Sequence, residues 1–141
     1  MRIRDMTSED YDALIDLWDA AGLSYRPNGR DARERIEREI AGPCSIFLVA
    51  EEEERLIGAV LGTHDGRKGW VNRLTVHPAW RRRGIATALV EELDRRLDAW
   101  GIEILTCLVE GWNADSMTLF ESIGFVSHDI RYYSRRKNPD V

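Results

Sequence analysis

The chain has 141 residues, of which 43% are hydrophobic and 32% are charged, and its formal net charge is −5. This length predicts one domain over residues 1–141, large enough to bury a single sizeable core. The negative net charge argues against a general nucleic-acid binder, which would present a basic face, and no apolar run reaches the roughly 18 residues of a membrane-spanning helix.

The first part of the chain predicts a strand and two helices. Residues 1–5 alternate in polarity as a short strand does, and Thr7 with the acids that follow it is typical of a helix start. A helical stripe of apolar residues then runs to Gly22, which favours a helix end. The Gly, Pro and Asn content of 22–29 predicts a loop, and residues 31–41 predict a second, charged helix.

Three β-rich runs follow, at residues 45–50, 56–62 and 70–76, and short polar turns join them. Such short connections predict an antiparallel meander. The acidic run 51–54 falls in the first of these turns. It is predicted to be a solvated turn rather than a metal site, because no second cluster of ligand residues accompanies it.

The clearest amphipathic helix is predicted at residues 84–100. Its apolar stripe recurs at every fourth position, at Ile85, Leu89, Leu93 and Leu97. The rest of the chain predicts a strand at 102–109, a helix from Asn113 to about Ile123, and a final strand from Phe125 to about Ser134. Because the long helix lies between two strands, a right-handed parallel crossover is expected. The predicted fold class is therefore α/β, a mixed sheet in the order β-α-α-β-β-β-α-β-α-β with helices on both faces.

The two cysteines, Cys44 and Cys107, lie in or beside apolar runs and have no metal-ligand spacing. They are predicted to be small buried residues of a protein in the reducing cytoplasm. The first five residues lack the apolar core of a signal peptide, which agrees with a cytoplasmic location.

An unusual stretch, Arg81-Arg82-Arg83-Gly84-Ile85-Ala86, precedes the long helix. The first turn of a helix leaves backbone N–H groups without partners and carries a partial positive charge, so it binds anions and above all phosphate. Gly84 lets a ligand approach the main chain closely, and arginines offer forked donors that suit phosphate oxygens. The stretch therefore indicates a diphosphate cradle; the alternative is an arginine-rich surface loop before an ordinary helix. Neither the P-loop nor the dinucleotide fingerprint occurs in the chain.

These residues resemble the GCN5-related N-acetyltransferase (GNAT) family, whose members bind acetyl-coenzyme A. Arg81-x-x-Gly84-x-Ala86 is similar to the family's Gln/Arg-x-x-Gly-x-Gly/Ala motif, and it follows Val76-His77-Pro78 as the family motif follows Val-x-Pro. Downstream, Asn113 precedes Leu119-Phe120-Glu121-Ser122-Ile123-Gly124-Phe125, which is similar to the family's Leu-Tyr-x-x-x-Gly-Phe string. The resemblance covers essentially the whole chain, and within the family it is strongest to small, stand-alone bacterial or archaeal acetyltransferases of the YpeA type.

The resemblance implies an N-acetyltransferase with acetyl-coenzyme A as acetyl donor and with no metal. The resemblance implies that the main chain at the helix start binds the diphosphate and that the end of the strand 70–76 binds the pantetheine arm. It also implies that a β-bulge in that strand donates an N–H to the thioester carbonyl and so stabilises the oxyanion. The implied coenzyme-binding residues are Leu74, Thr75, Val76, Arg81, Arg82, Arg83, Gly84, Ile85, Ala86, Thr87, Asn113 and Ser116.

Two catalytic side chains that the family usually carries are absent from their expected positions. The tyrosine of the family string is Phe120, and the strand position of the usual carboxylate reads Asn72-Arg73. Catalysis would then rest on proximity and a backbone donor, or on substitutes. Glu110 is the candidate base through a water molecule, and Tyr132 or Tyr133 is the candidate acid, of which alternation lets only one face the cleft. Glu110 also fits the ordinary role of a solvated loop acid, and the two tyrosines also fit the role of packing residues.

The third alternative is that the protein binds acyl-coenzyme A as a sensor or regulatory subunit and acetylates poorly. An acceptor is expected to enter opposite the coenzyme and to be a small-molecule or peptide amine. An acceptor that carries a carboxylate or phosphate as well as the amine is favoured, and a protein N-terminus or lysine is the alternative. The expected acceptor-side residues are Tyr25, Arg26, Asn28, Arg131, Tyr132, Tyr133 and Arg135. No nucleic-acid or membrane partner is expected, and pairing through residues 126–136 would make a homodimer by analogy with the family.

Overall fold

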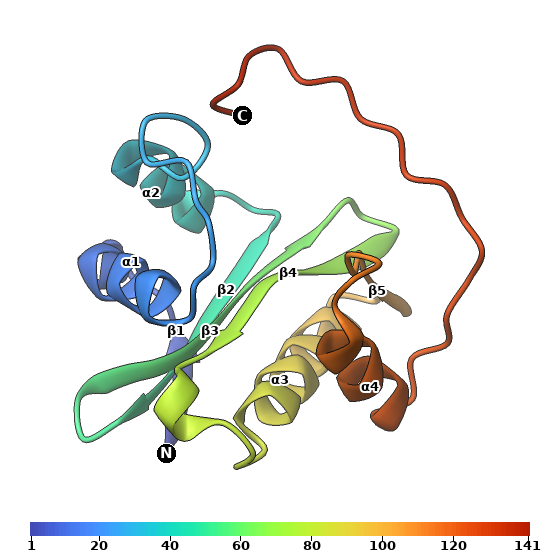
Figure 1. Cartoon of the computed structure of the whole chain (residues 1–141), viewed down its shortest axis with the longest axis horizontal. Coiled ribbons are helices and arrows are strands. Elements are labelled where there is room, and N and C mark those ends of the chain that lie inside the picture. The colour runs from blue at the N-terminus through green and yellow to red at the C-terminus, as the bar shows by residue number, and fades with distance from the viewer.

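The computed structural model describes residues 1–141, and its centre is a five-stranded sheet with helices on both faces (Figure 1). The strands lie in the order in which they occur along the chain: β1 (Arg2–Asp5), β2 (Ser45–Glu52), β3 (Arg55–His64), β4 (Lys68–Val76) and β5 (Ile104–Cys107). β1 to β4 pair antiparallel, whereas β5 pairs parallel with β4. The predicted α/β class, the meander and the parallel crossover are confirmed.

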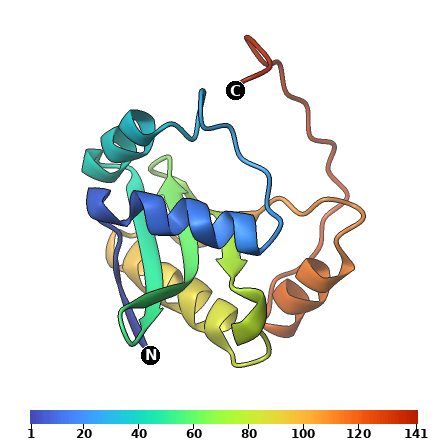
Figure 2. The ribbon, with the colours of Figure 1, turned by 60° about the vertical axis from the view of Figure 1, so that its left-hand side comes forward.

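The helices divide between the two faces of the sheet. They are η1 (Ser8–Asp10), α1 (Tyr11–Ala20), α2 (Arg33–Ala41), η2 (Pro78–Trp80), α3 (Ile85–Ala99) and α4 (Ala114–Ser122). Figures 1 and 2 show α1 and α2 on one face and α3 and α4 on the other. None of the helices combines the length and the apolar content that a membrane crossing requires.

Each face of the sheet buries its own core. Leu89 of α3 packs with Leu48 of β2 on one side, and Trp18 of α1 packs with Phe47 of β2 on the other. Residues 47–50 are all buried because alternate side chains enter opposite cores. This two-sided burial explains why that part of the sequence is a continuous apolar run rather than an alternating one.

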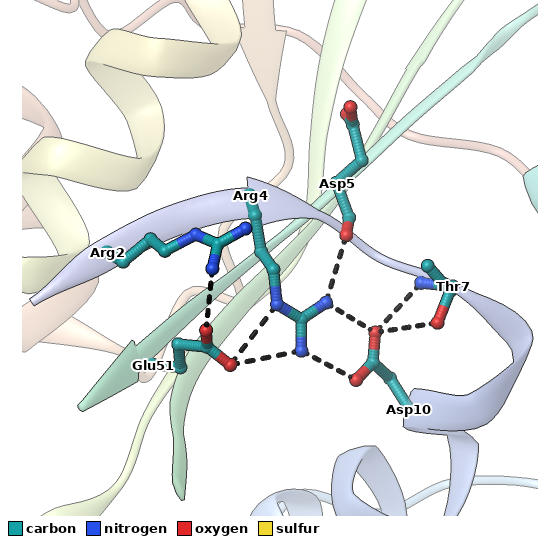
Figure 3. A network of polar contacts seen from close by, with 6 residues as sticks. All are labelled: Arg2, Arg4, Asp5, Thr7, Asp10 and Glu51. Atoms are coloured by element: carbon teal, nitrogen blue, oxygen red, sulfur yellow. Dashed lines mark hydrogen bonds and ion pairs between the residues drawn. The ribbon is translucent and has the colours of Figure 1, made fainter. Parts of the chain in front are cut away.

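A polar network fixes β1 to its neighbours (Figure 3). The Arg4 guanidinium donates to the Asp10 carboxylate at 2.8 and 2.9 Å and, through Nε, to Glu51 of β2 at 3.2 Å. The backbone N–H of Thr7 donates to the same Asp10 carboxylate at 2.8 Å. The hydrogen bonds from Arg4 hold the pKa of Asp10 below its ordinary value. Arg4 thus joins the first strand, the start of α1 and β2.

The prediction of a final strand at residues 125–134 is wrong, because the chain forms no strand after α4. Strand β5 has four residues, shorter than the predicted 102–109, and so offers few ladder partners. The polar run 127–129 also interrupts the apolar pattern. Val126, Ile130 and Tyr133 are consequently 74%, 79% and 88% exposed.

The segment 126–141, which we call the C-terminal tail, runs outside the body of the fold in both views (Figures 1 and 2). Its end reaches the loop between α1 and α2, where the Arg30 backbone N–H donates to the Asp140 carbonyl at 3.2 Å.

Candidate active site

Strands β4 and β5 pair only as far as Val71 with Cys107. β4 continues to Val76, but β5 ends at Cys107. The edge of residues 72–76 that faces away from β3 therefore has no strand partner, and we call it the free edge of β4. An unpaired strand edge presents backbone N–H and C=O groups, to which an extended ligand can bind as an added strand does. The structure thus leaves unpaired the main chain that the sequence assigned to pantetheine, at Leu74, Thr75 and Val76.

A β-bulge lies within this free edge, at Arg73 and Leu74. The pairing with β3 shifts register there, so that two residues of β4 face one residue of β3. Arg73 has a φ of 54°, in the left-handed region that residues other than glycine rarely adopt. Bulges bend a strand and redirect its backbone groups, and they are common beside active sites. A bulge in this strand was expected from the sequence and is present; its role toward a thioester stays a prediction.

The start of α3 presents a row of free backbone donors. The first α3 hydrogen bond runs from the Ala88 N–H to the Gly84 carbonyl at 3.0 Å, and none of the seven N–H groups of residues 81–87 donates to an acceptor within the chain. Gly84 has a φ of 75°, and a Cβ at this position would meet no atom within 4 Å. Glycine is therefore needed here for its backbone conformation, and the space beside it is open to a ligand.

The arginines of this loop lie on the surface around those donors. Arg81, Arg82 and Arg83 are exposed, and the Arg83 guanidinium stacks on the Trp80 ring at 4.7 Å from its centroid. The main chain at Ile85, Ala86 and Thr87 continues the row of free N–H groups into the helix. The loop thus combines backbone donors with full positive charges, the combination that binds diphosphate.

Asn113 and Ser116, the two predicted coenzyme contacts beyond β5, form the start of α4. The Asn113 side-chain oxygen accepts the Ser116 backbone N–H at 3.1 Å, which caps the helix. A ligand contact from these residues would therefore come from the Asn113 amide nitrogen and the Ser116 hydroxyl. Glu110 lies in the preceding loop, exposed, and its carboxylate makes no hydrogen bond or ion pair within the chain.

Phe120 belongs to the core. Its side chain is 7% exposed, and its ring meets the edge of Phe125 at a centroid distance of 5.0 Å. The position where the family string carries tyrosine is thus occupied by a packing residue that has no proton to donate.

Asn72 and Arg73 occupy the face of the sheet that α1 covers. The Asn72 amide nitrogen donates to the Leu61 carbonyl at 2.9 Å and to the Thr63 hydroxyl at 3.0 Å, which fixes its orientation. Arg73 stacks on the Trp18 ring at 4.3 Å and donates through Nη2 to the Ser24 carbonyl at 2.7 Å. In the sequence these two residues stand out only as missing carboxylates, and no local pattern indicates that Arg73 contacts the loop between α1 and α2. A charged residue inside an otherwise apolar strand was the signal that could have revealed it.

The loop between α1 and α2 forms the wall beside Arg73. Asp31 is 5% exposed and organises the loop: its carboxylate accepts the Arg26 backbone N–H at 2.8 Å, and its carbonyl accepts the Tyr11 hydroxyl at 2.6 Å. Tyr25 stands against Trp18 with ring centroids 5.9 Å apart. Of the acceptor-side residues expected from the sequence, Tyr25, Arg26 and Asn28 lie in this loop.

The remaining expected acceptor-side residues lie on the exposed C-terminal tail and do not form a second wall. They are Arg131, Tyr132, Tyr133 and Arg135. Two other hollows, of about 740 and 260 Å³, lie beside the charged face of α3 and beside Trp100. Neither is lined by any of the predicted site residues, and no group of three His, Cys, Asp or Glu side chains is arranged to hold a metal ion.

Comparison with known proteins agrees with this geometry. Residues 11–125 match the model of the "Acetyltransferase (GNAT) family". The chain belongs to this family of acetyltransferases. It is also 34% identical over 129 residues, 92% of this chain and 89% of the other, to "Acetyltransferase SG1711" of Sodalis glossinidius (strain morsitans).

Solved structures of N-acetyltransferases share the fold of this family member. The PaiA N-acetyltransferase of Thermoplasma acidophilum in complex with coenzyme A superposes with a TM-score of 0.81 at 22% identity, over 92% of each chain. AAC(6')-Iy, in complex with the bisubstrate analogue CoA-S-monomethyl-acetylneamine, gives a TM-score of 0.81 at 17% identity, over 96% of this chain and 97% of that one. At these identities the likeness concerns the fold, so the residues of the site must be argued from this chain itself.

Proposed function

We propose that this protein is an N-acetyltransferase that moves an acetyl group from acetyl-coenzyme A to a primary amine by direct attack in a ternary complex. The observation that carries the proposal is that the chain has two unpaired backbone surfaces, one at the end of β4 and one at the start of α3, which follows β4 after the short helix η2. The N–H groups of residues 81–87 suit a diphosphate, and the free edge of β4 suits an extended amide-containing chain. Coenzyme A has both parts, and two of the similar folds carry it or an analogue.

The residues present fit this donor. The diphosphate would lie on the main chain of Arg82, Arg83, Gly84, Ala86 and Thr87, with the charge of Arg81 and its neighbours around it and Ile85 completing the first helical turn. The pantetheine arm would pair with Leu74, Thr75 and Val76, between the free edge and the side chains of Asn113 and Ser116. When bound, acetyl-coenzyme A supplies the activated acyl carbon.

The remaining chemistry falls to the protein and the acceptor. The attacking amine must be neutral, since an ammonium with a pKa of about 10.4 has no free lone pair. The bulged backbone at Arg73 and Leu74 would donate an N–H to the carbonyl oxygen as negative charge develops there, which lowers the barrier. Holding the two reactants together supplies roughly 7–11 kcal/mol in favourable cases. The nitrogen–carbon bond forms, the carbon–sulfur bond breaks, and the amine proton leaves to water or to the thiolate.

Glu110 remains the candidate base, because its exposed carboxylate precedes Asn113 without a partner in the chain. Tyr132 remains the candidate acid only if the C-terminal tail moves onto the site when substrates bind. Two refinements of the sequence prediction are kept as part of the proposal: the likeness to the YpeA type, and a homodimer that pairs through residues 126–136.

A second function is favoured by the same site. Phe120 and Asn72 replace the usual acid and base, so the protein would serve equally well as an acyl-coenzyme A sensor that does not turn over. Calorimetric titration with coenzyme A, followed by thiol release from acetyl-coenzyme A with a panel of amines, separates the two. An amine that raises thiol release well above hydrolysis supports the enzyme. Tight coenzyme binding without any such amine supports the sensor, and no coenzyme binding overturns both.

A further inference from the structure

Arg73 is a charged residue held within a buried part of the sheet. Its side chain is only 20% exposed, and burial lowers the pKa of its guanidinium. Its φ of 54° places it in the bulge, and its contacts with Trp18 and Ser24 place its side chain on the face of α1 and the loop that follows. A charge kept in this position costs free energy of desolvation unless a partner compensates it.

The donors of Arg73 are mostly unused within the chain. An arginine carries five N–H groups, and in this structure only Nη2 donates, to the Ser24 carbonyl at 2.7 Å. Nε is fully buried and has no hydrogen-bond partner. Asp31 is the one acid nearby, and its nearest carboxylate oxygen is 3.9 Å from Nη2, beyond hydrogen-bond distance. A buried donor without a partner is costly, so the guanidinium is incompletely satisfied.

The charges around Arg73 leave an excess of positive charge. The Asp31 carboxylate lies 3.7 Å from Arg30 and already accepts the backbone N–H of Arg26, so it serves several donors at once. Two guanidinium groups, of Arg73 and Arg30, therefore share one carboxylate. An additional anion at this place would pair with Arg73 without displacing an existing hydrogen bond.

This unsatisfied cation lies beside the proposed reaction centre. Arg73 itself belongs to the bulge of the free edge, while its side chain points to the face opposite α3. We propose that Arg73 determines acceptor specificity by binding a carboxylate, so that the acceptor is an amine of the amino-acid class. The inference rests on the proposed acetyl transfer and names its substrate class. A carboxylate suits the site better than a phosphate dianion, since two guanidinium groups facing the one Asp31 carboxylate leave a single excess positive charge, which a singly charged anion neutralises.

Matched amine pairs that differ only in the carboxylate test this inference: L-lysine with cadaverine, L-tyrosine with tyramine, and L-arginine with agmatine. The kcat/KM for thiol release from acetyl-coenzyme A should favour the carboxylate member of a pair roughly 10- to 100-fold, the range for a hydrogen-bonded charge. Arg73→Asn should bring the ratio near one, because it should lower kcat/KM for the carboxylate member far more than for the decarboxylated member. Asparagine is chosen because it tolerates a positive φ.

The variant Arg30→Gln is the matched control. It removes the other guanidinium that faces Asp31 but lies outside the bulge, and it should keep the preference of the unmodified protein. If Arg73 only supports the loop between α1 and α2, Arg73→Asn will lower both members of each pair equally, which overturns the inference. A larger preference for O-phosphoethanolamine over ethanolamine than for any carboxylate pair would overturn the carboxylate class.

A binding measurement keeps the inference testable without turnover. In the presence of coenzyme A, Nε-acetyl-L-lysine should raise the melting temperature of the unmodified protein more than N-acetylcadaverine does, and Arg73→Asn should abolish the difference. Equal shifts for both products overturn the inference even if amines are acetylated. Failure to bind coenzyme A at all would instead overturn the proposed function.

Discussion

Replacing Gly84 with glutamate should weaken coenzyme A binding about a hundredfold, whereas the same replacement of Gly101 should leave it unchanged. The two glycines flank α3 at opposite ends, with φ values of 75° and 81°, and a Cβ at either position meets no atom within 4 Å. Both variants therefore carry the same backbone strain, about 1–2 kcal/mol, and should lose similar amounts of folding free energy. Any difference between them in ligand affinity must come from their location.

The expected magnitude follows from the free donors at Gly84. The new carboxylate would lie among the unpaired N–H groups of residues 81–87, where a diphosphate would bind. Loss of one hydrogen bond to a charged group costs about 1.5–3 kcal/mol, and like-charge repulsion at an exposed site adds about 1 kcal/mol. A total near 3 kcal/mol corresponds to roughly a hundredfold in Kd.

Isothermal titration with coenzyme A measures both Kd values, and thermal unfolding checks that both variants fold. Titration with pantetheine, which lacks the diphosphate, is the companion measurement. Pantetheine should bind the two variants with the same affinity. Equal coenzyme A affinity of Gly84→Glu and Gly101→Glu would refute the diphosphate assignment at the start of α3.

Three further predictions test the fold and the chemistry. Asp10→Asn should lower the free energy of unfolding at pH 7 by about 1.5–3 kcal/mol, because it removes the carboxylate that Arg4 binds. Since the pKa of Asp10 is depressed in the folded state, its contribution is present above the unfolded value of about 3.9 and is lost as pH falls through the folded pKa. The gap in unfolding free energy between the two proteins, measured by urea titration at several pH values, should thus close as pH falls through the folded-state pKa of Asp10; a gap that does not narrow as pH falls would contradict the ion pair as cause. Ending the chain at Ser127 should change the unfolding free energy by about 0.5 kcal/mol or less, because the removed residues other than Val141 are exposed and the truncation removes the single hydrogen bond from Arg30 to Asp140; a loss several times larger would mean that they pack as a strand. Finally, kcat/KM for a lysine-like amine should rise roughly tenfold per pH unit up to the acceptor's own pKa, because neither Phe120 nor Asn72 can exchange a proton. A plateau near neutral pH that Glu110→Gln abolishes would instead identify a protein base.

The elements of the sheet and of α3 could be predicted because each follows from a single local pattern in the sequence. Leu89 and its neighbours repeat every fourth residue, so one face of α3 had to be buried, and the short turns of the meander left few ways to pair its strands. The start of α3 could be foreseen because Gly84 and the arginines before it are local in sequence. The final strand was misjudged because a strand needs a partner, and the length of β5 cannot be read from residues 125–134.

The acceptor side was harder to predict because it is assembled from distant segments. Arg73 meets Ser24 and Asp31, which lie 49 and 42 positions away along the chain, and no local pattern links them. The bulge that turns Arg73 toward them is a register shift between β3 and β4, which periodicity does not encode. Residues on the C-terminal tail were assigned to the same side only because a final strand was assumed.

The acceptor side also bears on whether the protein is an enzyme or a sensor. A sensor that only binds acyl-coenzyme A needs the amides of residues 81–87 and the free edge of β4, and nothing on the face of α1. Yet this chain keeps a partly buried guanidinium at Arg73, with unused donors, against the aromatic ring of Trp18. Such a charge lowers stability unless something binds it, and a nearby cation also favours the neutral form of an incoming amine, which is the form that reacts. Absence of the carboxylate base at residues 72–73 is therefore compatible with the proposed catalysis, since Arg73 would both bind the acceptor and help to keep its amine deprotonated.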